Sequence, residues 1–242
     1  MTAAIRPPQT PLSAQEARLL ARLLCDTTER VLWQDWRQRI QQQRPEASLV
    51  CRVGSGNATY HRFHAGRQQH SITYGSRMVV AKFRAETAHG WLSSREIEAR
   101  NYFGGVVSTR HLLAHTCCHE FAHLLQQLAG HRYRGSVHNR HFYRLLDDLH
   151  RDGSAEHACD YLTDAARHHG LPLPDAAFPK AAALVAASTW RVGDAVRFGR
   201  DPGGHQGIIQ KVNRKTCTVL GTGPSKGLTY RVPFGLLRGE FG

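Results

Sequence analysis

The segment 108–129 restricts the possible folds of this chain most strongly, because its histidines recur at every fourth position. Within it, the pentapeptide HEFAH places His119 and His123 four residues apart, with Glu120 directly after the first histidine. A step of four residues turns an α-helix by about 400°, so both imidazoles project from one face. Gly130 is a typical residue just past a helix end. We therefore expect a helix over 108–129.

The HExxH pattern in this helix predicts a zinc site. Two imidazoles on one helix face can bind a single Zn²⁺ ion, while the adjacent carboxylate reaches the metal-bound water. His119 and His123 are the predicted ligands, and Glu120 is the predicted base that converts the water into a nucleophile. The alternative is a solvated helix face that is rich in histidine.

A catalytic zinc site needs a third protein ligand, and the residues leave three candidates. His138 heads the next predicted helix after a short connection, which would bring it near the end of the first. Glu156, with Asp160 four residues later, has the ExxxD arrangement of thermolysin-like sites, and His131 directly follows the first helix. Ala129 stands where metzincins have their third histidine, which excludes that class.

HEFAH followed, after fourteen intervening residues, by HNRHF resembles the SprT-like zinc metalloprotease domain, the family that includes Spartan. In that family a histidine heading an H-x-x-x-[FW] segment completes the HExxH site, and His138 and Phe142 occupy those positions. The resemblance covers roughly residues 48–150, and the family often has glycine where this chain has Asn139. It implies that His138 is the third ligand and that the substrate is a DNA-associated or DNA-crosslinked protein.

Other roles around the site stay open. His111 and His115 continue the histidine stripe and could line the cleft or contact substrate; we expect them to support the ligands from outside or to lie at the surface rather than to act in catalysis. A zinc peptidase also needs a group that stabilises the oxyanion. Four residues are candidates for that role: Tyr133, His131, His141 and Tyr161.

The N-terminal part mixes helical and β-rich segments. Residues 13–40 carry leucines at helical intervals, and Ser13 followed by Glu16 reads as a capping box. From 48 to 83, four short pieces including SLVCRV and RMVVAKF predict an antiparallel meander of three or four strands. The histidines within it, at positions 61, 64 and 70, are expected to be half-exposed.

The next segments predict more helices. Residues 91–105 are ambiguous between a loop and a short helix, whereas 137–151 and 155–168 read as amphipathic helices. We expect residues 1–170 to form an α+β, zincin-like domain in which helices cover an antiparallel sheet.

The C-terminal part differs in composition. Residues 171–188 are rich in proline and alanine and poor in charge, which is typical of a linker. Residues 189–242 read as short strands separated by DPGG, NRK and GPSKG turns, and GIIQKVNRKTCTVL resembles a KOW-type hairpin. The sequence therefore predicts a small SH3/KOW-like β-barrel.

Positive charge favours a polyanionic partner. The chain has a net charge of +13, and residues 190–242 hold nine basic against three acidic residues. Excess lysine and arginine raise affinity for nucleic acid through counterion release. We expect DNA contacts from Lys211, Arg214, Lys215 and Lys226; the alternative is a barrel that binds protein or braces the first domain.

Composition restricts the remaining possibilities. Six cysteines without a CxxC pair argue against a disulfide scaffold and against the four-cysteine zinc ribbon with which SprT-like proteins often end. We therefore expect buried thiols and one Zn²⁺ per chain. No signal sequence or membrane span is evident, so a location in the cytoplasm, including the nucleoid, is expected.

Three functions are consistent with these features. The first is a zinc metalloendopeptidase, and the second is a nucleic-acid-binding or transcription-associated factor with a structural or vestigial zinc site. The third is a zinc hydrolase that acts on a non-peptide bond. Glu120 favours an enzyme, because a purely structural site does not need a base beside its ligands.

Overall fold

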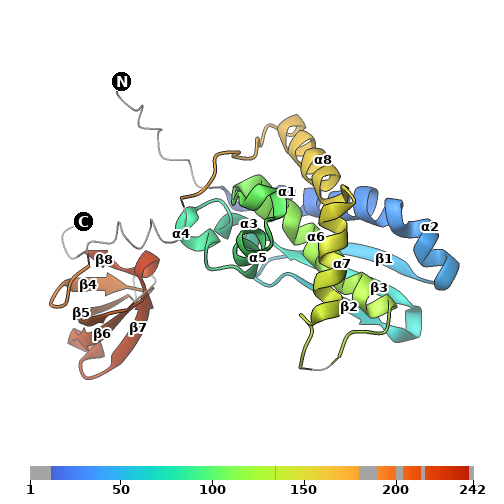
Figure 1. The fold of residues 1–242 in the computed structure, drawn as a ribbon. Helices are drawn as coiled ribbons and strands as arrows, with labels where there is room; N and C mark the ends of the chain where they lie inside the picture. The colour runs from blue at the N-terminus through green and yellow to red at the C-terminus, as the bar shows by residue number, and fades with distance from the viewer. Residues whose placement is uncertain (1–11, 134, 180–189, 200–203, 214–215, 240–242) are drawn as a thin grey trace. The chain divides into compact units, whose positions relative to one another are not determined.

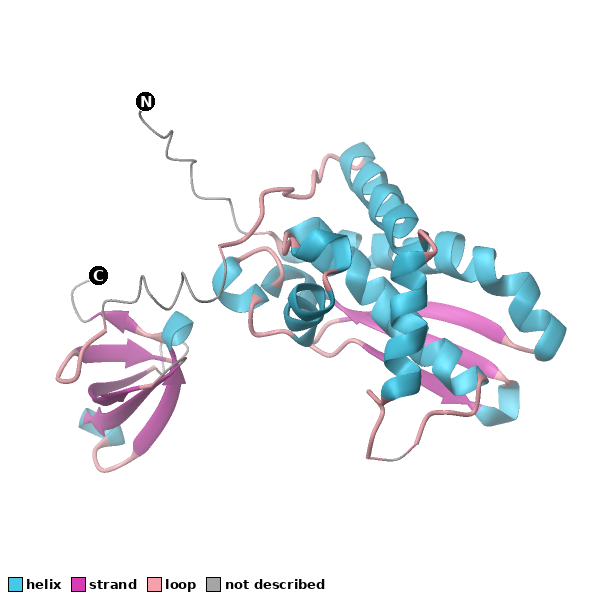
Figure 2. Cartoon of the chain, viewed as in Figure 1, coloured by secondary structure: helices cyan, strands magenta, loops and turns pink. Residues whose placement is uncertain are grey.

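The chain has a mixed α+β fold with two sheets (Figure 2). The computed structural model describes residues 12–133, 135–179, 190–199, 204–213 and 216–239. The chain divides into two compact units, Met1–Phe178 and Pro179–Gly242.

The N-terminal segment is helical, as its leucine spacing predicts, and its last helix ends before Pro45. Helix α1 (Ala14–Thr27) continues through π-helical turns (Thr28–Trp33) into α2 (Gln34–Gln43). The predicted capping box is confirmed: the Ser13 backbone N–H donates to Glu16 Oε2 at 2.7 Å, and the Glu16 N–H donates to Ser13 Oγ at 3.2 Å. These bonds satisfy backbone donors that the first turn leaves free.

The sheet of the first unit is mixed, so the predicted antiparallel meander is wrong. Strands β1 (Ser48–Gly54), β2 (Tyr60–His64) and β3 (Gln69–Gly75) lie in the order β1-β3-β2. β3 pairs antiparallel with β2 but parallel with β1. The central place of β3 buries Ile72 and Tyr74 completely. Alternation within one strand cannot predict which strands become its neighbours.

The segment RMVVAKF, predicted as a strand, is helical. Helix α3 (Ser76–Ala81) buries Met78 and Val79 against the core. A short apolar run has no periodicity that separates a strand from a buried helix, so tertiary packing decides.

The ambiguous segment 91–105 is also helical. After the short α4 (Ala85–Ala88), helix α5 (Leu92–Arg100) is followed by a 3₁₀ turn (Tyr102–Gly105). α5 packs against the long helix that follows this turn, so its side chains can take part in contacts with that helix.

Three further helices confirm the sequence predictions. They are α6 (Thr109–Leu128), α7 (Arg140–Arg151) and α8 (Ser154–His168). α7 begins three residues later than expected because Asn139 is its N-cap. α6 packs against β2 and β3 on one side and against α7 and α8 on another, so it lies at the centre of the unit (Figure 1).

The first unit extends into the predicted linker. Leu173 is buried, and the Phe178 N–H donates to the Val107 carbonyl at 2.7 Å. Residues 171–178, which the sequence places in the linker, therefore pack on the first unit because their apolar side chains find buried positions there. Residues 180–189 lie outside the described part of the chain.

The second unit contains a five-stranded antiparallel sheet in the order β7-β6-β5-β4-β8. Val196, Ile209, Cys217 and Val219 form its buried core. Its strands are β4 (Ala195–Phe198), β5 (His205–Val212), β6 (Thr216–Thr222), β7 (Thr229–Pro233) and β8 (Arg238–Gly239).

The cysteines are free thiols, as predicted, and all except the half-buried Cys51 are buried. Among the described residues, no helix is both long enough and apolar enough to cross a membrane.

Gly75 is expected to be irreplaceable at the end of β3. A Cβ atom at this position would lie 2.3 Å from the Gly56 carbonyl oxygen and 2.7 Å from that of Ala58. Because both obstacles are backbone atoms, Gly75→Ala should lower the free energy of unfolding by about 1–3 kcal/mol, measured by chemical denaturation. Gly66→Ala is the control, since no atom lies within 4 Å of its added Cβ. Equal effects of the two changes would contradict this close approach.

Candidate metal centre

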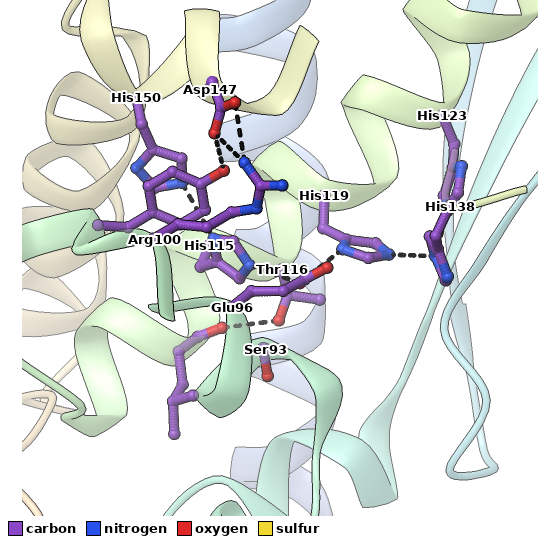
Figure 3. Close-up of polar contacts among 12 residues, drawn as sticks. Ser93, Glu96, Arg100, His115, Thr116, His119, His123, His138, Asp147 and His150 are labelled. Carbon is purple, nitrogen blue, oxygen red and sulfur yellow. Dashed lines mark hydrogen bonds and ion pairs between the residues drawn. The ribbon is translucent and has the colours of Figure 1, made fainter. Parts of the chain in front are cut away.

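The candidate metal centre forms where α6 meets the loop that precedes α7. His119 and His123 project from α6, and His138 lies on the loop (Figure 3). The Nε2 atom of His138 is 3.2 Å from His119 Nε2 and 3.1 Å from His123 Nε2. Two nitrogen ligands of a tetrahedral zinc ion are about 3.3–3.4 Å apart when each Zn–N distance is about 2.0–2.1 Å. The two distances from His138 are thus close to the spacing of ligands around one ion, and the three ligand atoms all lie within 4.8 Å of one another.

Neighbouring acceptors fix the tautomers of both helix histidines. His119 Nδ1 lies 3.0 Å from Glu96 Oε2, and His123 Nδ1 lies 3.3 Å from Gln126 Oε1. Because a carboxylate or amide oxygen only accepts, each ring donates its Nδ1–H and keeps a lone pair on Nε2. Both lone pairs face the same point, which is the donor set that a cation requires.

The Gln126 side chain is itself fixed in orientation. Its Nε2 donates to the Val137 carbonyl at 2.9 Å and to Asn139 Oδ1 at 3.1 Å, which leaves Oε1 to accept from His123. Asn139 Oδ1 also caps α7 by accepting from the backbone N–H of His141 at 3.0 Å. The residue before this cap is His138, the third histidine of the centre. The hydrogen bonds that cap α7 therefore also fix the position of this ligand.

The Phe142 ring packs against the three imidazole rings. Its side chain is fully buried, and its ring centroid lies 4.8, 4.3 and 4.9 Å from those of His119, His123 and His138. It occupies the aromatic position of the H-x-x-x-[FW] segment. An apolar ring here restricts the imidazoles without competing for the cation.

Burial favours the neutral form of two of the three imidazoles. It lowers the pKa of His123 to about 3, assisted by repulsion from His119. Burial and His119 also lower the pKa of His138. Neutral imidazole is the form that binds metal, so His123 and His138 need not lose protons when an ion binds near pH 7. Glu96 remains ionised: burial alone would raise its pKa, but hydrogen bonds from His115 and His119 hold that pKa well below its usual range.

Glu120 follows His119 on α6, and one of its carboxylate oxygens makes no hydrogen bond among the described residues. The residue is 6% exposed, and its Oε2 has no hydrogen-bond partner among the described residues. Burial raises the pKa of this carboxyl, while nearby His119, Arg132 and Lys82 oppose the shift. A buried polar atom without a partner is rare in proteins and marks a place where water or substrate fits.

His119 and Glu120 also line a cleft of about 170 Å³, together with residues of α3 and α5. At its wall Lys82 is fully buried, and its Nζ donates to Ser93 Oγ at 2.9 Å, to the Leu112 carbonyl and to Thr116 Oγ1. Burial lowers the pKa of Lys82 to about 7. Sequence reasoning missed this residue because it lies in the apolar run RMVVAKF.

Arg132, which contacts strand β2, is a second residue that sequence reasoning missed. Its guanidinium donates to the ring Nδ1 and to the carbonyl of His61, the latter at 3.4 Å. His61 Nε2 lies 2.9 Å from His70 Nδ1, and both rings are buried. The expectation of half-exposed strand histidines is therefore wrong at these two positions, because β3 is central and α6 covers β2.

The alternative third ligands lie elsewhere. His131 Nδ1 is 3.1 Å from the Tyr133 hydroxyl, and its ring stacks on His141 at 4.0 Å. Glu156 is exposed in the first turn of α8, and Tyr161 is half-buried on the same helix. Neither His131 nor Glu156 belongs to the two His/Glu groups that could hold a metal in the described chain.

The remaining histidines of the stripe are buried. His111 Nδ1 donates to the Val106 carbonyl at 2.7 Å, and the ring stacks on Phe103. His115 bonds Glu96 at 2.9 Å. Both contact neighbouring segments, so the stripe is not a solvated helix face.

The predicted DNA-contacting residues are placed only in part. Lys211 is exposed on β5, and Lys226 is exposed after the 3₁₀ turn Gly223–Ser225. Arg214 and Lys215 lie outside the described residues.

Comparison with protein-family models, with curated proteins and with solved structures gives no match for this chain. Its function must therefore be inferred from the geometry of the centre and from the sequence motifs.

Zinc binding should require His138. The purified chain is expected to bind one zinc equivalent, and His138→Ala should weaken zinc affinity more than about 100-fold because a direct ligand outweighs its outer partners. Competition with a chromophoric chelator measures this. His131→Ala should keep wild-type affinity. Loss of zinc from Glu156→Ala with retention by His138→Ala would instead indicate a thermolysin-like arrangement.

Acid should destabilise the first unit through the His61–His70 pair. Burial lowers the pKa of His61 to about 2 and that of His70 to about 4, against about 6.5 for unfolded histidine. Their contribution to stability is therefore complete above pH of about 6.5 and is lost as pH falls towards 4, because only the unfolded chain takes up these protons.

Denaturant unfolding with a chelator present, at pH 7.5 and pH 5, measures the effect. His70→Gln should flatten the pH dependence, and an exposed control, His168→Gln, should not. A free energy of unfolding that does not change with pH would contradict the assignment.

Proposed function

We propose that this chain is a zinc-dependent metalloendopeptidase of the SprT-like type. One observation carries the proposal: the ligand nitrogens of three histidines lie within 4.8 Å of one another, and Glu120, which lines a cleft together with His119, has a buried Oε2 with no hydrogen-bond partner among the described residues. A structural zinc site is closed by its ligands and does not need a base. The third ligand expected from the family resemblance, His138, is the one that lies within 3.2 Å of both helix ligands.

His119, His123 and His138 would hold one zinc ion per chain. When bound, zinc supplies a Lewis acid that polarises a peptide carbonyl and lowers the pKa of water. Glu120 Oε2 takes the proton of the attacking water and later delivers it to the nitrogen of the departing amine. Burial raises the pKa of Glu120, which favours the protonated form needed for that second transfer.

The arrangement around α6 supports a zincin-like fold for the first unit. α6 packs along β2, and among the described residues β2 pairs with β3 alone, so β2 is an edge strand; its His61 carbonyl accepts from Arg132. An extended peptide can add to such an edge through main-chain hydrogen bonds. This would present a scissile bond to the centre that α6 carries.

Charge supports DNA-associated or DNA-crosslinked proteins as substrates. We assign the five-stranded sheet of the second unit to an SH3/KOW-like barrel that binds DNA, with Lys211 and Lys226 among its contacts. Both are exposed, and the whole chain carries a net charge of +13. Such a protein would work in the cytoplasm, at the nucleoid.

The test compares wild type with Glu120→Gln on histone bound to duplex DNA. Glu120→Gln should keep one zinc equivalent but cleave about 10²–10⁴-fold more slowly, because the general base is lost. Glu156→Gln, an exposed substitution on α8, should cleave like wild type. Gel analysis of the products measures the rates.

A DNA-free arm tests the partner. Removing the DNA should slow the wild type, and Lys211→Ala with Lys226→Ala should reduce that difference. If wild type and Glu120→Gln both bind zinc and DNA yet cleave equally or not at all, the chain is a nucleic-acid-binding factor with a structural zinc site. Cleavage of an ester or nucleotide substrate alone would indicate a hydrolase of non-peptide bonds.

A further inference from the structure

Glu96 lies behind His119, on the side away from the other two histidines (Figure 3). It belongs to α5 and is 4% exposed. Its Oε2 accepts from His119 Nδ1 at 3.0 Å and from His115 Nε2 at 2.9 Å. Within the described part of the chain, it is the carboxylate that pairs with one of the three candidate ligands.

A chain of contacts holds Glu96 in place. His115 donates its Nε2–H to Glu96, so its Nδ1 must accept, and His150 Nε2 lies 3.0 Å from that atom and supplies the proton. His150 stacks on Tyr102 with a centroid distance of 3.7 Å and an angle of 5°. The Tyr102 hydroxyl donates to Asp147 at 2.6 Å. One consistent assignment of hydrogen-bond donors and acceptors therefore links α5, α6 and α7.

This contact has two effects on a cation at the centre. Accepting the Nδ1–H holds His119 in the tautomer whose Nε2 lone pair faces the site, and it raises the basicity of that nitrogen. Three neutral ligands leave the charge of a divalent ion uncompensated. The Glu96 carboxylate places a negative charge on the other side of the His119 ring from such an ion. Both effects are stronger in a buried site, where the effective dielectric constant is low.

We propose that Glu96 is the positioning residue of the metal centre, and that it increases metal affinity through His119. The proposal rests on the proposed function only in that the centre binds a metal. Two alternative roles for Glu96 compete with this one. Glu96 could merely stabilise the helix packing, or Glu96, His115 and His119 could form a second metal site.

Zinc affinity distinguishes these three roles. Glu96→Ala should bind zinc about 10–100-fold more weakly than wild type, measured by competition with a chromophoric chelator. Glu96→Gln should lie between them, because its amide oxygen still accepts the hydrogen bond but lacks the charge. Glu98→Gln, an exposed change on the same helix, should equal wild type.

A metal-free readout reports the tautomer directly. Nitrogen-15 spectra of the histidine side chains, with chelator present, should show His119 protonated on Nδ1 in wild type and as a mixture of tautomers in Glu96→Ala. Thermal unfolding of the metal-free variants separates a loss of stability from a loss of affinity. An altered tautomer population and weaker zinc binding at unchanged stability would support the proposal.

Three results would overturn it. If both Glu96 variants bind zinc with wild-type affinity, whatever their stability, Glu96 has only a structural role. Two zinc equivalents in wild type, falling to one in Glu96→Ala, would establish a second metal site. Failure of wild type to bind any zinc would overturn the proposed function as well, whereas zinc binding without peptidase activity would leave the Glu96 proposal standing.

Discussion

The convergence of three imidazole Nε2 atoms is the constraint on which the rest of the site depends. Lone pairs that face one another across 3.1–3.2 Å repel unless a cation or a proton lies between them. The outer nitrogens of His119 and His123 face acceptors, Glu96 and Gln126, and this removes the option of turning a donor inward. A proton on His138 Nε2 could still be donated to one of these two rings, whereas a cation between the three nitrogens satisfies all three lone pairs.

Two of the helices packed on α6, α5 and α7, contribute to this arrangement. α5 supplies Glu96, the loop before α7 supplies His138, and α7 supplies Phe142, which packs against the imidazole rings. The Asn139 cap joins the start of α7 to Gln126 on α6, so the relative position of the two helices determines where the third histidine lies. Rigid elements hold such a site more accurately than a free loop would.

Several buried polar side-chain atoms have no hydrogen-bond partner in the described part of the chain. Among the described residues they include Glu120 Oε2, Glu96 Oε1 and His70 Nε2. Each costs stability, since a buried donor or acceptor loses its hydrogen bonds to water. Glu120 also lines the cleft that Lys82 lines, and a buried carboxylate with a raised pKa in a cleft is typical of a functional site.

The sequence by itself determined the features that depend on neighbours along the chain. The helix over 109–128, the shared face of His119 and His123, and the Ser13 cap all follow from contacts within a few residues. The family resemblance added His138 as the expected third ligand. Tertiary structure decided the parallel pairing of β1 with β3 and the helical state of 76–81.

The contacts of Glu96 and Arg132 were also decided only in three dimensions. Glu96 meets His119 across 23 residues, and Arg132 meets His61 across 71. Local propensity and periodicity carry no information about such pairs, because the free energy that selects them comes from burial and pairing of side chains that only the folded chain brings together.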